Sequence, residues 1–221
     1  MVKELLQSDY KTLAVYTTDE QVLPFENAQP LLTVITDIQL SKISNLETPN
    51  KVLAVAEIPE QNFSFDAVAS KLSLALDTIN DPGNLGTIIR TAAWFGIETI
   101  ICSATTADAW NAKAVQASMG ALFRVKVVYA DLEKVVADYT KNDIPVYATT
   151  LDGDNIYTSE LAANGLIIIG SESHGVSKEL LSLIDKKLLI PSFAAGNAES
   201  LNAAVAAGVV CSEFRRRGYF N

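Results

Sequence analysis

From residue 72 onward, short apolar runs alternate with segments whose apolar residues recur at helical spacing. The apolar runs predict strands at 72–79, 97–103, 123–128, 144–150, 165–172 and 186–192. The segments around them predict helices at 84–96, 111–122, 131–142, 159–164, 177–185 and 199–218. Several strands are continuously apolar, which is typical of strands buried on both faces of a sheet. Alternating strands and helices indicate an α/β fold with a mostly parallel, open sheet.

The first 60 or so residues have a different pattern, with more prolines and shorter apolar runs. Their pattern predicts a helix at 2–8, a strand at 12–18, a helix near 35–44 and a strand at 51–58. Residues 59–71 are polar, show no sustained period and predict a linker. We therefore expect two domains, residues 1–68 and 70–221, with a boundary near residue 70.

Hydrophobic residues make up 49% of the 221 residues, which is enough for a buried core. No apolar run reaches the roughly 18 residues that a membrane-spanning helix needs. The N-terminal residues lack the continuous apolar segment of a signal peptide. These patterns favour a cytoplasmic protein that has no membrane partner.

The chain has two cysteines and one histidine, and a net charge of −9. Cys102 and Cys211 lie in apolar stretches and are expected to be buried, reduced thiols. With His174 as the sole histidine, the chain offers no zinc tetrad, so we expect no metal site. The acidic balance argues against nonspecific binding of polyanions, but net charge does not describe a local patch.

Polar residues and glycines follow three of the predicted strands, and ligands of open α/β sheets bind beyond the carboxyl ends of strands. The residues are Asn84 and Arg90 after the first strand, Gly170, Glu172 and Gly175 after the fifth, and Glu199, Ser200 and Asn202 after the sixth. Each group alone has a structural explanation, as a turn, a solvated carboxylate or a helix cap. The combination of all three at strand ends indicates a functional site.

The glycines of the first turn, at 83 and 86, do not match G-x-G-x-x-G or G-x-x-x-x-G-K-[ST]. A dinucleotide-binding oxidoreductase would need the first of these patterns and an acidic residue about 20 positions later. Both are absent, which argues against that class.

The sequence resembles the SpoU-type (TrmH-like) RNA 2′-O-ribose methyltransferases of the SPOUT superfamily over about residues 72–217. The first family motif is similar to DPGNLGTIIRTAAWFG, the second to IIIGSESHGVS and the third to IPSFAAGNAESLNAAVAAG. The intervening stretch NAKAVQASMGALFRV is also similar. The segment from Pro191 to Ser200 is longer than in the common family version, which weakens residue-level inference there.

The resemblance implies a C-terminal trefoil knot that binds S-adenosylmethionine, largely through main-chain groups of the second and third motifs. The implied cofactor-binding residues are Thr149 (or Thr150), Gly170, Glu172, Ile190, Ser200 and Leu201. It also implies a homodimer whose active site lies at the subunit interface, where the last helix contributes to the interface or the core.

The implied reaction transfers a methyl group to a ribose 2′-hydroxyl of rRNA or tRNA. The implied catalytic residues are Asn84, Arg90, Glu172, Ser200 and Asn202. Arg90 is either the base that removes the 2′-hydroxyl proton or a fixed cation that binds phosphate and the developing oxyanion. Glu172 organises the site, for instance by pairing with Arg90. His174 is interpreted as a loop residue.

The N-terminal segment weakly resembles the small L30e-like RNA-binding domain that precedes the catalytic domain in many members. Here that domain is incomplete and lacks the usual basic segment, which argues against strong RNA binding by the segment alone. An alternative function is therefore a non-catalytic RNA-binding or ribosome-assembly factor that retains the methyltransferase fold. Binding of S-adenosylmethionine distinguishes the two.

Overall fold

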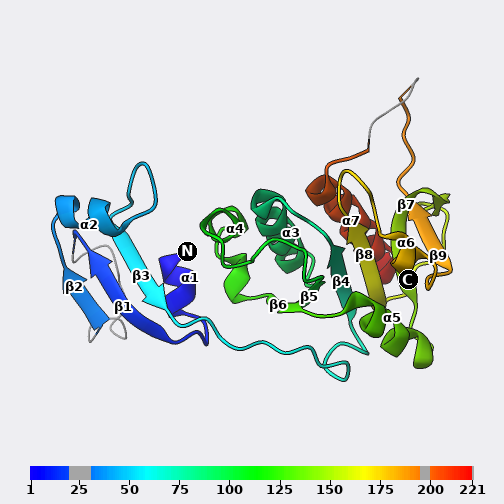
Figure 1. The fold of residues 1–221 in the computed structure, drawn as a ribbon, viewed down its shortest axis with the longest axis horizontal. Coiled ribbons are helices and arrows are strands. Elements are labelled where there is room, and N and C mark those ends of the chain that lie inside the picture. The colour runs from blue at the N-terminus through cyan, green and yellow to red at the C-terminus, as the bar shows by residue number, and fades with distance from the viewer. Residues whose placement is uncertain (20–30, 195–199, 221) are drawn as a thin grey trace. The chain divides into compact units, whose positions relative to one another are not determined.

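The computed structural model describes residues 1–19, 31–194 and 200–220 (Figure 1). The chain divides into two compact units, Met1–Glu60 and Gln61–Asn221. The division falls within the polar segment 59–71, somewhat before the boundary expected near residue 70. None of the helices in the described ranges is both long and apolar enough to cross a membrane.

The first unit contains a three-stranded sheet in the order β2-β1-β3, in which β1 pairs parallel with β2 and antiparallel with β3. Its elements are α1 (Val2–Leu6), β1 (Thr12–Thr17), β2 (Leu32–Val34), α2 (Asp37–Ile43) and β3 (Val52–Ala56). The three-residue strand β2 was not predicted, because so short a run carries no period. A capping box begins α2: Gln39 N–H donates to Thr36 Oγ1 (3.2 Å), and Thr36 N–H donates to Gln39 Oε1 (2.9 Å).

The second unit is built on a six-stranded sheet in the order β6-β5-β4-β8-β7-β9, with every neighbouring pair parallel. The strands are β4 (Leu72–Asp77), β5 (Thr99–Cys102), β6 (Lys126–Tyr129), β7 (Val146–Asn155), β8 (Gly165–Gly170) and β9 (Lys186–Leu189). The helices are α3 (Pro82–Trp94), α4 (Ala112–Ser118), the 3₁₀ turn η3 (Ala121–Phe123), α5 (Leu132–Lys141), α6 (Lys178–Leu181) and α7 (Ala203–Phe220). The predicted α/β class and parallel sheet are confirmed.

Both faces of this sheet are covered. Leu74 and Leu76 of β4 belong to a core cluster with residues of α3 and α7. Ala75, which points the other way, belongs to a second cluster with residues of α5 and α6. Every residue of β4 is buried, which explains why its sequence is apolar apart from Ser73 and Asp77.

The strand order reverses between β4 and β8. The chain runs outward through β5 and β6, crosses to β7, and returns with β8 between β4 and β7. In open parallel sheets, such a reversal opens a crevice at the carboxyl ends of the strands. The sheet therefore has its expected ligand site beside Asp77 and Gly170, the paired last residues of β4 and β8.

The predicted helix at 159–164 is wrong. Thr158 and Ser159 hydroxyls both donate to the Asn155 carbonyl, and Tyr157 N–H donates to Asn155 Oδ1 (2.9 Å). These side-chain bonds close a turn and compete with a helix. The strand before this turn extends to Asn155, beyond the predicted end at residue 150, with a register shift between Thr149 and Asp154.

Helices α3 and α7 lie side by side and run in the same direction. Their first turns meet through Asn84 and Asn202. At their other ends, Arg215 of α7 donates to the carbonyl oxygens of Phe95 (2.7 Å) and Gly96 (2.8 Å), which follow α3. Gly96, which follows the C-cap residue Phe95, has φ +64°, the left-handed conformation common just after the end of a helix.

A buried carboxylate joins two arginines near the end of α7. Glu213 is 5% exposed and accepts from Arg216 Nε and Nη2 (2.7 Å each) and from Arg217 Nε (2.9 Å). Arg217 also donates to the Tyr157 carbonyl. The hydrogen bonds from Arg216, opposed by burial and aided by Arg217, lower the pKa of Glu213 to about 2.

We expect Glu213→Gln to lower the free energy of unfolding at pH 7 by about 2 kcal/mol. Because the carboxyl pKa is lower in the folded chain, its stabilisation is present above pH about 4.5 and is lost as pH falls toward 2. Urea unfolding at fixed protein concentration should therefore show the two proteins converging between pH 4.5 and 2. The control Glu179→Gln, on the surface of α6, should stay within about 0.5 kcal/mol at all pH values. A constant gap for Glu213→Gln would contradict the charge-based account.

Candidate functional site

The first site segment links β4 to α3. Asp81 is the N-cap of α3, and its Oδ2 accepts from Asn84 N–H (3.3 Å). Pro82 occupies the first helical turn, where a missing N–H costs nothing. A Cβ on Gly86 would lie 2.4 Å from the Ala114 carbonyl oxygen, so this glycine permits the close approach of α4. Gly86 is therefore required for helix packing.

The second segment is a tight hairpin after β8. Ser171 and Gly175 exchange backbone hydrogen bonds of 2.9 and 3.1 Å, and Gly175 has φ +68°. A Cβ on Gly170 would lie 2.0 Å from the Gly175 carbonyl carbon, so the returning chain passes directly over Gly170. Ser177 is the N-cap residue of α6 but makes no side-chain cap hydrogen bond; its N–H donates to Asp77 Oδ2 (2.7 Å).

The third segment precedes α7. Asn202 Oδ1 accepts from the N–H groups of Ala204 (3.0 Å) and Val205 (3.4 Å). Asn202 therefore caps the helix, which begins at Ala203 rather than at the predicted residue 199. Glu199 lies outside the described residues.

These three segments meet through one chain of side-chain hydrogen bonds. Asn202 Nδ2 donates to Asn84 Oδ1 (3.1 Å), and Asn84 Nδ2 donates to Glu172 Oε1. Ser200 Oγ donates to the Glu172 carbonyl (3.3 Å). Because Asn202 uses its oxygen for the helix cap, only its amide nitrogen is left for Asn84, and the orientation of Asn84 follows. The structure brings together four of the five predicted catalytic residues.

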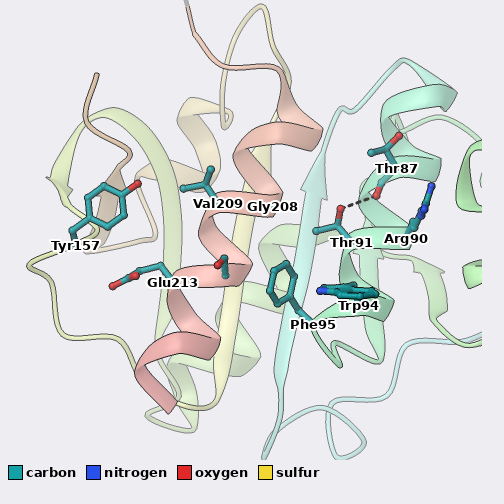
Figure 2. Close-up of a pocket in the computed structure, with 10 residues that line it drawn as sticks. Thr87, Arg90, Thr91, Trp94, Phe95, Tyr157, Gly208, Val209 and Glu213 are labelled. Atoms are coloured by element: carbon teal, nitrogen blue, oxygen red, sulfur yellow. Dashed lines mark hydrogen bonds between the residues drawn. The ribbon is translucent and has the colours of Figure 1, made fainter. Parts of the chain in front are cut away.

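Arg90, the fifth, lies on the exposed face of α3 and lines a cavity of about 700 Å³ (Figure 2). Residues of α3, α7 and the turn after β7 form its walls: Thr87, Arg90, Thr91, Trp94, Phe95, Tyr157, Gly208, Val209, Ser212 and Glu213. Within the described ranges, Arg90 takes part in no hydrogen bond or ion pair. The predicted pairing of Glu172 with Arg90 is not formed among the described residues; Glu172 Oε1 accepts from Asn84 Nδ2 instead.

Three predicted cofactor residues lie on or just after the adjacent strands β8, β7 and β9. Gly170 ends β8, Thr149 lies where β7 leaves its register with β9, and Ile190 follows β9. Thr149 Oγ1 donates to the Ile168 carbonyl (3.0 Å), which ties β7 to β8. Thr150 Oγ1 is buried and has no hydrogen-bond partner among the described residues. An unpaired buried hydroxyl beside a glycine-lined strand end fits a polar ligand at this edge.

Leu201 and His174 differ from these residues in their exposure to solvent. Leu201 is 47% exposed and lies two residues before the start of α7. His174 is exposed, and its Nδ1 lies 2.7 Å from Ser173 Oγ within the hairpin, as a loop residue.

Neither thiol is a candidate nucleophile. Cys102 and Cys211 are free and buried, as predicted. Burial raises the pKa of each thiol to about 12, so the reactive thiolate is not populated at neutral pH.

The sequence analysis missed Asp77 and the pair Asp81–Lys113. Asp77 is 6% exposed and ties the first segment to the second. A single carboxylate ending an apolar strand was the available signal for it. Lys113 Nζ lies 2.5 Å from Asp81 Oδ1 and is the main reason that the pKa of Asp81 lies below its usual value.

Comparison with known proteins places this geometry in context. The family model described as the SpoU rRNA Methylase family matches residues 71–212. The 23S rRNA (guanosine(2553)-2′-O)-methyltransferase RlmP of Bacillus subtilis is 32% identical over 217 residues, which is 97% of this chain and 85% of that protein. An uncharacterised tRNA/rRNA methyltransferase from Mycolicibacterium paratuberculosis is 36% identical. The chain spans about half the length of that protein (47%).

Solved structures agree over nearly the whole chain. A TrmH-family protein from Porphyromonas gingivalis is 34% identical with a TM-score of 0.87, covering 98% of this chain and 86% of that one. The SpoU methyltransferase AviRb from Streptomyces viridochromogenes, in complex with AdoMet, is 26% identical with a TM-score of 0.84. That match covers 100% of this chain and 88% of that one.

Proposed function

The chain belongs to the SpoU rRNA methylase family, and from this premise we infer that it transfers a methyl group from S-adenosylmethionine to a ribose 2′-hydroxyl of RNA. One observation carries the assignment: the hydrogen-bond chain from Asn202 through Asn84 to Glu172, on the helix that also holds Arg90, a cation with no ion pair among the described residues. A fold kept only for assembly would have no need of this arrangement. The site predicted from the sequence is proposed as the active site.

S-adenosylmethionine supplies the electrophilic methyl group, so the protein's task is to align the ribose oxygen and exclude water. Asn84 and Asn202 hold the start of α3 against the start of α7, which sets the position of Arg90 two turns further along α3. Confining two reactants in this way can lower a barrier by roughly 7–11 kcal/mol in favourable cases.

Arg90 is proposed to act as a fixed cation that binds the phosphate beside the target ribose and stabilises the developing oxyanion. No carboxylate among the described residues pairs with Arg90, which supports binding of an anion by the guanidinium. In the alternative role, Arg90 removes the 2′-hydroxyl proton. A base would give the pH–rate profile a titrating limb that Arg90→Lys displaces, whereas a fixed cation would leave the shape of the profile unchanged.

The cofactor is proposed to lie against the main chain at Gly170, Ile190 and Leu201, with the Thr149–Thr150 edge beside it. The support is the unpaired Thr150 hydroxyl and the hairpin that passes over Gly170. Glu172 and Ser200 border the same edge. Calorimetric titration with S-adenosylmethionine tests this site, and a complete lack of binding would favour the non-catalytic assembly factor.

A trefoil knot is proposed for the C-terminal part of the second unit. Its support is that α7 lies between α3 and the connection after β7. Arg217 of α7 bonds to the Tyr157 carbonyl of that connection, and Ile156 N–H bonds to the Leu189 carbonyl (3.0 Å). An experimental structure whose C-terminal segment does not pass through a loop of the preceding chain would contradict the knot.

A homodimer is proposed to form through the exposed apolar side chains of α3 and α7. Trp94 is 84% exposed and Val205 53%, and Trp94 borders the cavity that also contains Arg90 (Figure 2). Exposed tryptophans are frequent anchors of interfaces. This arrangement would bring the partner next to Arg90.

We expect Trp94→Asp to convert the dimer to a 23.8 kDa monomer at micromolar concentration. Burying a carboxylate in an apolar interface without a partner is costly. Sedimentation velocity measures the mass. Leu183→Asp is the matched control, because Leu183 is also an exposed apolar residue (46%) but lies in the turn after α6. It should leave the mass unchanged. A wild-type protein that is already monomeric would contradict the proposal.

The first unit is proposed as a partial L30e-like domain (residues 1–68) that contacts RNA, and residues 70–221 as the methyltransferase domain. Residues 1–68 contain four lysines and ten acidic residues, a difference of −6, so any contact to RNA must be local. Crosslinking of rRNA to the full chain, followed by peptide mapping, tests the role. Crosslinks found only in residues 70–221 would argue against it.

The substrate is proposed to be ribosomal RNA, with tRNA as the alternative, in the cytoplasm. The Bacillus subtilis and Streptomyces viridochromogenes relatives are named as 23S rRNA 2′-O-methyltransferases, which supports rRNA. Mapping 2′-O-methyl sites in total RNA, with and without the gene, identifies the modified nucleotide. Loss of a site in tRNA alone would select the alternative.

A further inference from the structure

Lys113 lies over the first turn of α3, outside the residues assigned to the reaction. Its side chain is 63% exposed, and its ammonium group contacts Asp81 Oδ1 at 2.5 Å. A Cβ on Gly83 would lie 3.0 Å from Lys113 Cε, so the lysine crosses directly over that glycine. The cation therefore lies on the rim of the proposed active site.

The position of Lys113 is coupled to the site through Asp81. One carboxylate oxygen of Asp81 binds Lys113, and the other accepts from the Asn84 N–H. Asn84 in turn donates to Glu172. Lys113 is thus the solvent-exposed end of the network that orients Asn84.

The main chain around Lys113 is also held against the first segment. Asn111 caps α4 and accepts from Lys113 N–H (2.9 Å). The loop before it is fixed by Ala107 N–H to the Ile79 carbonyl (2.9 Å) and by Thr106 Oγ1 to the Leu76 carbonyl (3.0 Å). These bonds hold the loop before α4 and the first turn of α4, which contains Lys113, against the first segment.

Gly83, Thr87 and Arg90 are spaced by four and three residues, so they lie on one face of α3. Seven residues of helix span about 10 Å. Lys113, above Gly83, and Arg90 therefore place two cations along one helix face. Proteins that bind single-stranded nucleic acid follow its backbone with such rows of positive charge.

We propose that Lys113 binds a phosphate of the RNA substrate, on the same strand as the phosphate next to Arg90. Asp81 holds the ammonium group in place before RNA arrives and competes with the phosphate for it. The inference rests on the proposed function and adds a substrate-binding residue to it.

The test measures binding of rRNA extracted from cells that lack the gene, over a range of salt concentrations. We expect Lys113→Gln to weaken binding 3- to 10-fold and to reduce the slope of log K against log salt by about 0.7–0.9, the value for one phosphate. Lys113→Arg should restore both. Asp81→Asn keeps the helix cap but removes the competing charge, so it should tighten binding.

Lys134→Gln is the matched control, because Lys134 pairs with Asp131, the N-cap of α5, on the opposite sheet face. It should change neither affinity nor slope. Unchanged RNA binding by Lys113→Gln would overturn the proposal. Equal weakening by Lys113→Gln and Asp81→Asn would also overturn it, because it would show that the Lys113–Asp81 ion pair has only a structural role. Methyl transfer by the wild-type protein is measured separately, so failure of the enzymatic assignment remains distinguishable.

Discussion

Replacing Arg90 with alanine is expected to lower kcat for methyl transfer by about 10³-fold, while binding of S-adenosylmethionine changes less than twofold. Removing a preorganised group that stabilises developing negative charge typically costs 10²–10³ in rate, and a catalytic arginine costs more. Arg90 lies on α3, whereas the proposed cofactor edge is formed by β7, β8 and β9. The Arg90 substitution should therefore lower the rate of methyl transfer without weakening cofactor binding.

Single-turnover transfer to rRNA from cells lacking the gene measures the rate, and calorimetry measures cofactor affinity. Arg124→Ala is the matched control, because Arg124 is an exposed arginine after η3 that does not line the cavity. Its kcat should stay within about twofold of wild type. Full activity of Arg90→Ala would exclude Arg90 from the reaction.

The second large effect is expected for Gly170→Ala. The new Cβ would lie 2.0 Å from the Gly175 carbonyl carbon and 2.1 Å from Val176 N, both backbone atoms that cannot rotate away. The hairpin must open, which moves Glu172 away from Asn84 and Ser177 away from Asp77. We expect a loss of about 3 kcal/mol in unfolding free energy, or a more than 10²-fold weaker affinity for S-adenosylmethionine.

Urea unfolding and calorimetry distinguish these two results. Ser173→Ala is the control in the same hairpin, because it removes an exposed hydroxyl that contacts only His174 among the described residues. It should change the unfolding free energy by less than about 0.5 kcal/mol. A Gly170→Ala protein with wild-type stability and affinity would show that the hairpin does not pack as closely as this structure indicates.

The parallel sheet was predictable because its signal is local and strong. The central strands β4 and β8 are short, mainly Leu- and Ile-rich runs, and burial on both faces leaves no alternation to obscure this signal. The segment 159–164 was not predictable in this way. Its apolar residues fit a helix, but the turn built on Asn155 satisfies the backbone first.

The meeting of Asn84, Glu172 and Asn202 was expected only from the resemblance, since these residues are separated by 88 and 118 positions from Asn84. Individual residue types gave no direction for their hydrogen bonds. The side-chain oxygen of Asn202 caps α7, which leaves its amide nitrogen to donate to Asn84. Only the geometry of the folded chain shows which group donates and which accepts. The expected Glu172–Arg90 pair is not formed among the described residues, because residue types alone do not show that Glu172 accepts from Asn84.

The parallel arrangement of α3 and α7 has a consequence for how an acidic protein selects RNA. Both helices start near the Asn84–Asn202 contact, so the positive ends of two dipoles lie together near Lys113, and Arg90 follows further along α3. Attraction there is short-ranged, whereas the net charge of −9 repels RNA at a distance. We expect the enzyme to bind most cellular RNA weakly. It should bind tightly only those RNAs whose folded strand can reach the starts of α3 and α7.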